Sequence, residues 1–138
     1  MIDFTSDFGA RAERHLIEDH VIWLTTVDSH TKPQPRPVWF LWDGESLLVY
    51  SRPQASKVRH LKTNPHVALN FNSDHSGGDI VVLLGEAHIL KSLIPEDLIT
   101  RYVEKYSQGM KNISLTPADF RNTYSVAIKI IPTSLRGH

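Results

Sequence analysis

Residues 34–51 hold two apolar runs joined by a tight turn, and this segment limits the possible folds more than any other. "QPRPVWFLW" (34–42) and "ESLLVYS" (45–51) both predict strands, and Asp43-Gly44 between them is a strong hairpin signal. Both faces of the first run are apolar, with Pro37, Trp39 and Leu41 on one and Val38, Phe40 and Trp42 on the other. One face can fill a core. We therefore expect the other to be covered by a helix of this chain, a second subunit or a flat ligand.

Three prolines enter this run at intervals of two residues. In an extended chain the missing N–H groups of Pro33, Pro35 and Pro37 face the same edge, so that edge cannot donate ladder hydrogen bonds. The pattern predicts an edge strand. One interpretation is protection against strand-to-strand aggregation, and another is a backbone left free beside a bound planar molecule.

The remaining sequence alternates short strand and helix patterns within one predicted domain, residues 1–138. β-Branched and alternating apolar residues predict strands at 20–28, 66–72, 79–90 and 125–133, with Gly85 as a bulge or bend. Capping residues and helical spacing predict helices at 5–19, 55–65, 94–107 and 116–124. Residues 134–138 are too few for another element. Six strands joined mostly by short turns favour a mainly β (α+β) fold, in which an antiparallel sheet closes into a small barrel with short peripheral helices.

Charge and motif content exclude several classes of function. Lys and Arg together number 15, as do Asp and Glu, so no excess charge points to nucleic acid or to a membrane surface. No apolar run approaches the roughly 20 residues that span a bilayer, and no signal pattern opens the chain. The chain has no Cys, which suits the cytoplasm. The 8 His residues form neither HxH nor HExxH, and no Ser lies in GxSxG, so we expect no metal site and no serine hydrolase.

A basic segment follows the hairpin. Between residues 51 and 73 no Asp or Glu occurs, whereas four Lys or Arg residues do. In "SRPQASKVR" a strand end leads through a turn into a predicted helix that starts near Ser56 and Lys57. A helix N-terminus offers free backbone N–H groups, and a hydroxyl and an ammonium group complete an anion site. Phosphate is the natural ligand of such a turn. The alternative is a basic helix face that contacts only solvent.

These residues and their order resemble the pyridoxamine 5'-phosphate oxidase-like superfamily of FMN-binding split barrels. The similarity is greatest to its short-chain branch of F420-dependent enzymes. It runs through "WLTTVDSHTKPQPRPVWFLWDGESLLVYSRPQASKVRHLKTNPHVAL", "GGDIVVLLGEAHIL", "YVEKY" and "YSVAIKIIPTSLRG", and so covers most of the chain. The single motifs are short, so their order and spacing carry the resemblance.

The resemblance implies a six-stranded split β-barrel that forms a homodimer, with cofactor sites at the subunit interface. In such a dimer the partner subunit and the cofactor ring would together cover the second apolar face of the 36–42 strand. The cofactor-binding positions that it implies are Arg36, Pro37, Val38, Trp39, Tyr50, Ser51, Ser56 and Lys57. The first four follow the flavin or deazaflavin ring, with Arg36 reaching the phosphate side, and the last two bind the phosphate. Some relatives carry Arg at the position of Ser56, so this chain has one charge fewer there. True pyridoxamine-phosphate oxidases continue well beyond this length with a substrate-binding tail, so we do not expect vitamin B6 oxidation.

The function implied by the resemblance is hydride transfer between bound FMN or coenzyme F420 and a small organic substrate. The branch favours F420. Arg52, Arg59 and Lys62 would suit the anionic tail of F420 and would equally suit solvent. No catalytic acid or base is assigned. The alternative is a non-enzymatic split barrel that binds or stores a flavin or haem.

Overall fold

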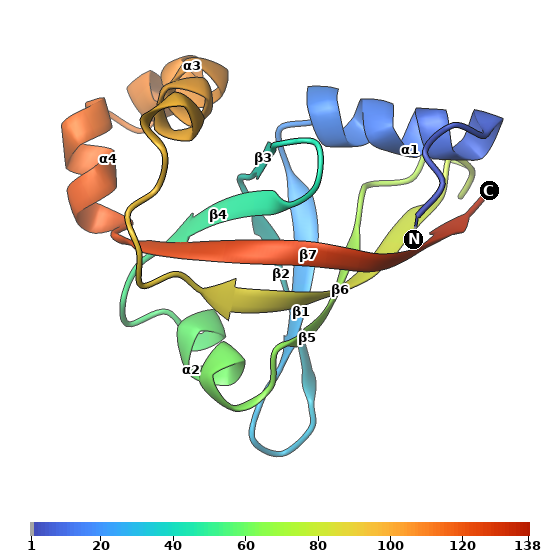
Figure 1. Cartoon of the computed structure of the whole chain (residues 1–138), viewed down its shortest axis with the longest axis horizontal. Helices are drawn as coiled ribbons and strands as arrows, with labels where there is room; N and C mark the ends of the chain where they lie inside the picture. Colours follow the sequence, from blue (N-terminus) through green and yellow to red (C-terminus); the bar gives the residue numbers. More distant parts are fainter. Residues whose placement is uncertain (1) are drawn as a thin grey trace.

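The computed structural model describes residues 2–138 and folds seven strands into one curled antiparallel sheet (Figure 1). The strands are β1 (Ile22–Val27), β2 (Pro33–Val38), β3 (Leu41–Trp42), β4 (Leu47–Ser51), β5 (His66–Asn70), β6 (Val81–Ile89) and β7 (Val126–Gly137). Their order across the sheet is β2-β1-β5-β6-β7-β4-β3. The helices are α1 (Asp7–Glu18), α2 (Ser56–Thr63), α3 (Glu96–Asn112) and α4 (Pro117–Thr123). The expected mainly β fold with peripheral helices is confirmed, with the sheet curled into a half-barrel.

The prediction of six strands is wrong, because the run at 34–42 is divided in two. The ladder to β1 ends at Val38, and β3 starts at Leu41 in a new pairing with β4. Between them the Phe40 N–H donates to the Tyr106 hydroxyl at 2.8 Å, and the Phe40 carbonyl accepts from the same hydroxyl at 2.9 Å. The Lys105 ammonium also donates to this carbonyl, at 2.9 Å. Helix α3 therefore takes the backbone groups that a continuous strand would have used.

Strand β2 lies at the edge of the sheet, as the prolines predict. Within residues 2–138 it pairs with β1 alone, over six residue pairs. Only Gln34, Arg36 and Val38 can donate N–H groups to that ladder at alternate positions, so the proline nitrogens face the outer edge. The carbonyls of Pro33 and Pro35 face the same way, since the two groups of one residue share a side. This outer edge accepts hydrogen bonds and donates none.

The concave face of the sheet holds the main hydrophobic core. Phe40 and Trp42 lie in this cluster with residues of β1, β4, β5, β6 and β7, and Val38 packs against it. Helix α1 closes one end with Ala12 and Leu16, both fully buried. One face of the 34–42 run therefore fills the core, as expected.

Helices α3 and α4 cover the second apolar face. Leu41 packs there with Tyr102, Tyr106 and Met110 of α3 and Phe120 of α4, in a separate cluster. Helix α4 begins with a capping box formed by Thr116 and Asp119. Of the three possible covers, an internal helix is the one found at Leu41. The expected cover by a partner subunit and a ring is therefore wrong at Leu41, because helices of the same chain already bury it.

Strand β7 is longer than the sequence pattern predicts. Residues 134–137 continue the strand by pairing with the first residues of β6, so the tail is not a separate end piece. A register shift falls between Leu84 and Gly85, at the expected bulge. A Cβ at Gly85 would come within 2.6 Å of the Ile131 carbonyl oxygen, so the close approach requires glycine.

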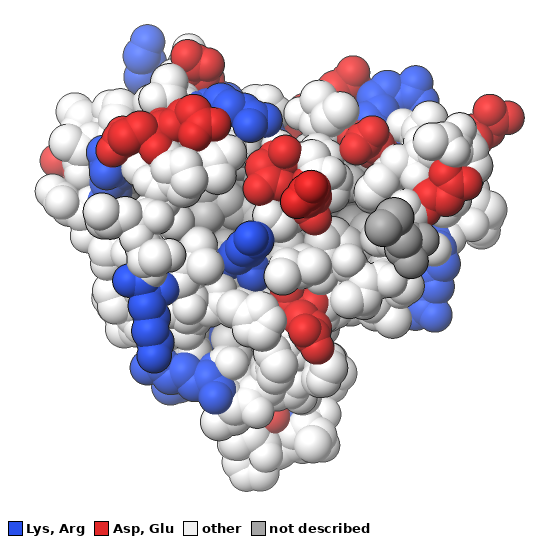
Figure 2. Space-filling view, in the orientation of Figure 1, with Lys and Arg blue, Asp and Glu red and all other residues white. Residues whose placement is uncertain are grey.

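Ion pairs connect α1 to the segment before β6. Arg11 contacts Asp79, and His15 lies between Asp79 at 2.9 Å and Asp19 at 2.7 Å. Partial burial lowers the pKa of His15, but the hydrogen bonds to the two carboxylates outweigh it, so the net shift is upward. The His15 ring also stacks on Phe71, at 5.1 Å between centroids. On the face in Figure 2, acidic and basic side chains are both present over α1 and α3.

Candidate functional site

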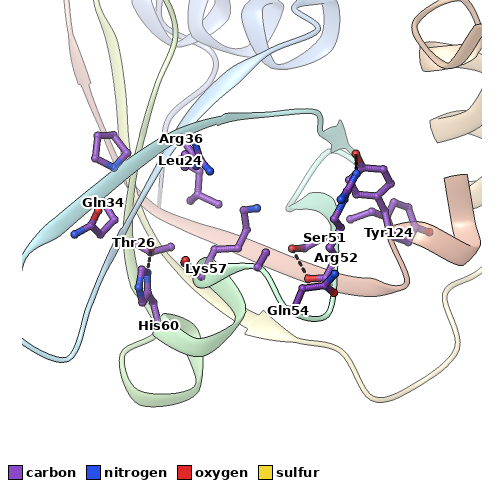
Figure 3. Close-up of a pocket in the computed structure, with 14 residues that line it drawn as sticks. Leu24, Thr26, Gln34, Arg36, Ser51, Arg52, Gln54, Lys57, His60 and Tyr124 are labelled. Atoms are coloured by element: carbon purple, nitrogen blue, oxygen red, sulfur yellow. Dashed lines mark hydrogen bonds between the residues drawn. The ribbon is translucent and has the colours of Figure 1, made fainter. Parts of the chain in front are cut away.

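A cleft of about 860 Å³ opens between β1, β2, the end of β4 and α2 (Figure 3). We name it the cationic cleft, because Arg36, Arg52 and Lys57 line it and no Asp or Glu does. Within residues 2–138 none of these three cations forms an ion pair. Figure 3 shows Lys57 extending from α2 into the middle of the cleft, toward Arg36. The cleft is therefore a positive cavity without an internal counter-charge.

The turn after β4 places Lys57 in this cleft. β4 ends at Ser51, and α2 begins at Ser56 with no side-chain cap at Ala55 and no acidic residue in its first turn. The positive end of the helix is thus not neutralised by the chain. Burial lowers the pKa of Lys57, and the nearby Arg36 guanidinium lowers it further. A bound anion would oppose both effects, because it supplies the missing negative charge.

Two serine hydroxyl groups that line the cleft differ in their ability to donate a hydrogen bond to a ligand. Ser51 is buried, and its hydroxyl donates to the Arg52 carbonyl at 3.1 Å. The Ser56 oxygen accepts from Arg59 at 3.2 Å, which leaves the Ser56 proton available. Of these two serines, Ser56 can donate to an anion without losing a bond, whereas Ser51 would first have to release its carbonyl partner.

A second pocket, of about 330 Å³, adjoins the cleft. We name it the aromatic pocket, because the rings of Trp39, Tyr50, Tyr102, Phe120 and Tyr124 line it. Pro37 and Val38 contribute from β2, and Val21 and Ile113 are also part of the lining. Tyr50, Lys57 and Tyr124 line both cavities, so the two share a wall. A single amphiphilic molecule could therefore contact aromatic rings at one end and cations at the other.

All the predicted cofactor positions line one or both of these cavities. The cationic cleft takes Arg36, Ser51 and Ser56, the aromatic pocket takes Pro37, Val38 and Trp39, and both take Tyr50 and Lys57. Sequence reasoning did not assign Tyr102, Phe120, Tyr124 or His60 to a site. The first three lie on α3 and the α4 end, and the four-residue spacing of Phe120 and Tyr124 was the available signal. That the eight predicted positions bind a cofactor stays a prediction.

Two further properties of the described chain bear on the site. No group of three His, Asp or Glu residues within 2–138 is arranged to hold a metal ion. No helix in the same range has the length and apolarity needed to cross a bilayer.

The half-barrel and its two adjoining cavities define a protein of the split-barrel class. Residues 9–137 match the sequence profile of the pyridoxamine 5'-phosphate oxidase family, and the chain belongs to that family. No curated protein matches the sequence.

Three solved structures are similar over nearly the whole chain. An F420 reductase shares 25% identity at a TM-score of 0.68, covering 90% of this chain and 94% of its own. The haem-storage protein HutZ from Vibrio cholerae shares 16% identity at 0.70, covering 93% and 92%. An FAD-binding protein from Mesorhizobium loti shares 18% identity at 0.69, covering 91% and 90%. The last two likenesses establish the fold alone.

Proposed function

We propose that this chain is an oxidoreductase that binds FMN or coenzyme F420 and transfers a hydride to or from a small organic molecule. The observation that carries the proposal is the junction of the cationic cleft and the aromatic pocket at Tyr50 and Lys57. Both cofactors join a flat tricyclic ring to a phosphate, and this junction offers a surface for each part. The family contains oxidoreductases, and the similar F420 reductase supports the same class of reaction.

The residues present fit the phosphate end of such a cofactor. Lys57 and Arg36 converge without a carboxylate between them, and the uncapped start of α2 lies beside them. The Ser56 hydroxyl retains a proton to donate. Helix N-termini with adjacent cations are established anion sites in proteins. Arg52 adds a third cation to the cleft, which would suit the longer anionic tail of F420.

The chain's contribution to the chemistry is binding and orientation. The bound cofactor supplies the hydride chemistry. Lys57 and Arg36 fix the anionic end, and the backbone of Pro37, Val38 and Trp39 lies where the ring is proposed to rest. The rings around the aromatic pocket exclude water from that side. Between the two candidates we favour F420, on the branch resemblance and the third cation.

We propose that the active form is a homodimer. The outer edge of β2 is exposed, and Pro37 and Arg36 on this strand belong to the site. Val21 and Ile113, at 39% and 49% exposure, place apolar surface at the rim of the aromatic pocket. A second copy seated at this rim would cover it. Sedimentation-velocity measurements at several concentrations test the assembly, and a monomer at all of them contradicts it.

Titration of the purified chain with FMN and with F420 tests the cofactor proposal, using quenching of cofactor fluorescence. We expect micromolar or tighter binding of one of them. Lys57→Gln should weaken that binding about 10- to 100-fold, because a hydrogen bond to a charged group contributes about 1.5–3 kcal/mol. Lys62→Gln is the matched control, since Lys62 lies on the same helix, is exposed and lines neither cavity. Equal effects of the two substitutions, or no binding of either cofactor, would contradict the proposal.

One observation supports a second candidate, a haem-binding or haem-storage protein. His60 lines the cationic cleft, and its Nδ1 is held by the Thr26 hydroxyl at 2.8 Å. If Nδ1 carries the proton, Nε2 is free to bind an iron, while Arg36 and Lys57 could pair with propionates. A haem titration with a Soret shift that is lost in His60→Ala would favour this candidate. Turnover with a reduced cofactor would favour the first.

A further inference from the structure

A third cavity, of about 380 Å³, lies beside the connection 90–95 between β6 and α3. Figure 1 shows this connection passing the start of β7 and helix α4 on its way to α3. We name the cavity the β6–α3 pocket. It shares only Tyr50 and Tyr124 with the cationic cleft and the aromatic pocket, so these two side chains separate it from both. Its volume is within the range of ligand cavities.

Much of the lining of the β6–α3 pocket is apolar. Leu90 and Ile94 pack against the cluster formed with α3 and α4, in which Ala127 is buried, and all three line the pocket. Leu93 also lines it and is 98% exposed. An apolar group placed on this surface would remove it from water, which is favourable.

Two side chains of opposite charge line the same pocket. Glu96 is the first residue of α3, and Arg121 belongs to α4. Within residues 2–138 neither takes part in an ion pair, so a guest can lie between them. Burial raises the pKa of Tyr50, the Arg121 guanidinium lowers it, and the Glu96 carboxylate raises it. Both charges therefore act on the hydroxyl of one residue of the pocket.

We propose that the β6–α3 pocket binds a zwitterion with an apolar side group, such as an aromatic or aliphatic α-amino acid. The guest carboxylate pairs with Arg121, its ammonium group pairs with Glu96, and its side group rests on Leu90 and Ile94. A simple anion would be repelled by Glu96 and a simple cation by Arg121, whereas a zwitterion is attracted by both. This proposal goes beyond the proposed function and does not rest on it, because neither charged residue lines the cavities assigned to the cofactor.

A chemical-shift titration of the full, ¹⁵N-labelled chain without cofactor tests the proposal. Three probes share one phenyl group and differ in charge: L-phenylalanine, 3-phenylpropanoate and 2-phenylethylamine. We expect saturable binding of L-phenylalanine in the millimolar range or tighter, and weaker binding of the other two. The amide signals that move should belong to residues 90–99 and 121–127, which surround the pocket.

Substitutions should separate the two charges. Glu96→Gln should weaken binding of L-phenylalanine and of the amine, but not of 3-phenylpropanoate, and Arg121→Gln should weaken binding of L-phenylalanine and of 3-phenylpropanoate, but not of the amine. Each loss should be about 5-fold, equivalent to about 1 kcal/mol, the upper end for a charge pair that keeps contact with water. Asp97→Asn and Lys91→Gln are the matched controls, since both residues are exposed, adjoin the pocket in sequence and line none of the three cavities.

The outcomes separate this proposal from the cofactor proposal. Absence of saturable shifts with L-phenylalanine, or shifts confined to other parts of the chain, overturns the site. Equal losses for all three probes, or losses as large in the control variants, overturn the pairing with Glu96 and Arg121. Failure of FMN and F420 to bind overturns the proposed function alone, because the amino-acid titration contains no cofactor.

Discussion

The hydroxyls of Tyr106 and Tyr102 allow a matched test of how α3 holds the strand break. Both side chains are 1% exposed, and they lie one helical turn apart. The Tyr106 hydroxyl accepts from the Phe40 N–H at 2.8 Å and faces the carbonyls of His20 and Phe40 at 2.7 and 2.9 Å. The Tyr102 hydroxyl has no hydrogen-bond partner within residues 2–138. Changing either residue to Phe removes its hydroxyl oxygen, which is hydrogen-bonded in Tyr106 and lacks a partner in Tyr102 within residues 2–138.

The magnitudes follow from those partners. Tyr106→Phe leaves the Phe40 N–H buried without an acceptor and leaves the His20 carbonyl without this donor, while Lys105 still donates to the Phe40 carbonyl. An orphaned buried group costs about 1–3 kcal/mol, so we expect a loss of about 2–4 kcal/mol in the free energy of unfolding. Tyr102→Phe removes a group that is already unpaired, so we expect between no change and a gain of about 1 kcal/mol. The two variants should differ by at least about 2 kcal/mol.

Urea unfolding, followed by tryptophan fluorescence and by circular dichroism, measures both free energies on the same scale. The slope of free energy against urea should match the wild type in both variants, so that a shift in midpoint reports stability. Each lost kcal/mol should also lower the Tm by about 3–5 °C at this chain length. Equal stabilities of the two variants, or a Tyr106→Phe variant as stable as the wild type, would refute the assignment of the strand break to Tyr106.

Two further predictions concern α1 and the packing around Trp39. The pKa of His15 is raised in the fold, so its stabilising contribution is complete below the ordinary value of 6.5 and is lost as the pH rises through the raised value. His15→Gln should therefore flatten the fall in unfolding free energy as the pH rises above the ordinary value of 6.5, and an unchanged fall would contradict the ion pairs to Asp19 and Asp79. Gly109→Ala should gain less than the usual benefit of about 1 kcal/mol, because a Cβ there lies 3.0 Å from ring carbons of Trp39. Urea unfolding measures this difference, and a full gain in the free energy of unfolding would count against this contact.

The sequence contained the features that depend on near neighbours along the chain. Asp43-Gly44 predicted the hairpin, and Gly44 takes the positive φ of 102° that such a turn needs. The proline spacing predicted the edge strand, and the alternation of β1 and β5 predicted their buried faces. The turn from Ser51 to Lys57 is also local, which is why its residues could be placed at one site.

What the sequence did not reveal depends on contacts between distant residues. An aromatic run gives no sign of an interruption, because the Phe40 backbone leaves the ladder only when Tyr106, 66 positions later, replaces the ladder partners. The tail beyond residue 133 becomes strand only because β6 offers an edge to pair with. The aromatic pocket joins residues of β2, β4, α3 and the end of α4, so this cavity could not be predicted from near neighbours along the chain.

The proline-bearing border of β2 has a consequence for how copies of this chain can meet. Laid against itself, it would set carbonyl opposite carbonyl, with no amide proton to bridge them. Chains therefore cannot stack edge to edge through this border, which is the kind of contact that builds fibrils. Any lasting partner has to bring its own donors or attach through side chains. The side chains of Gln34 and Arg36 stay available for recognition, while the outer edge of β2 cannot pair with the same edge of a second copy.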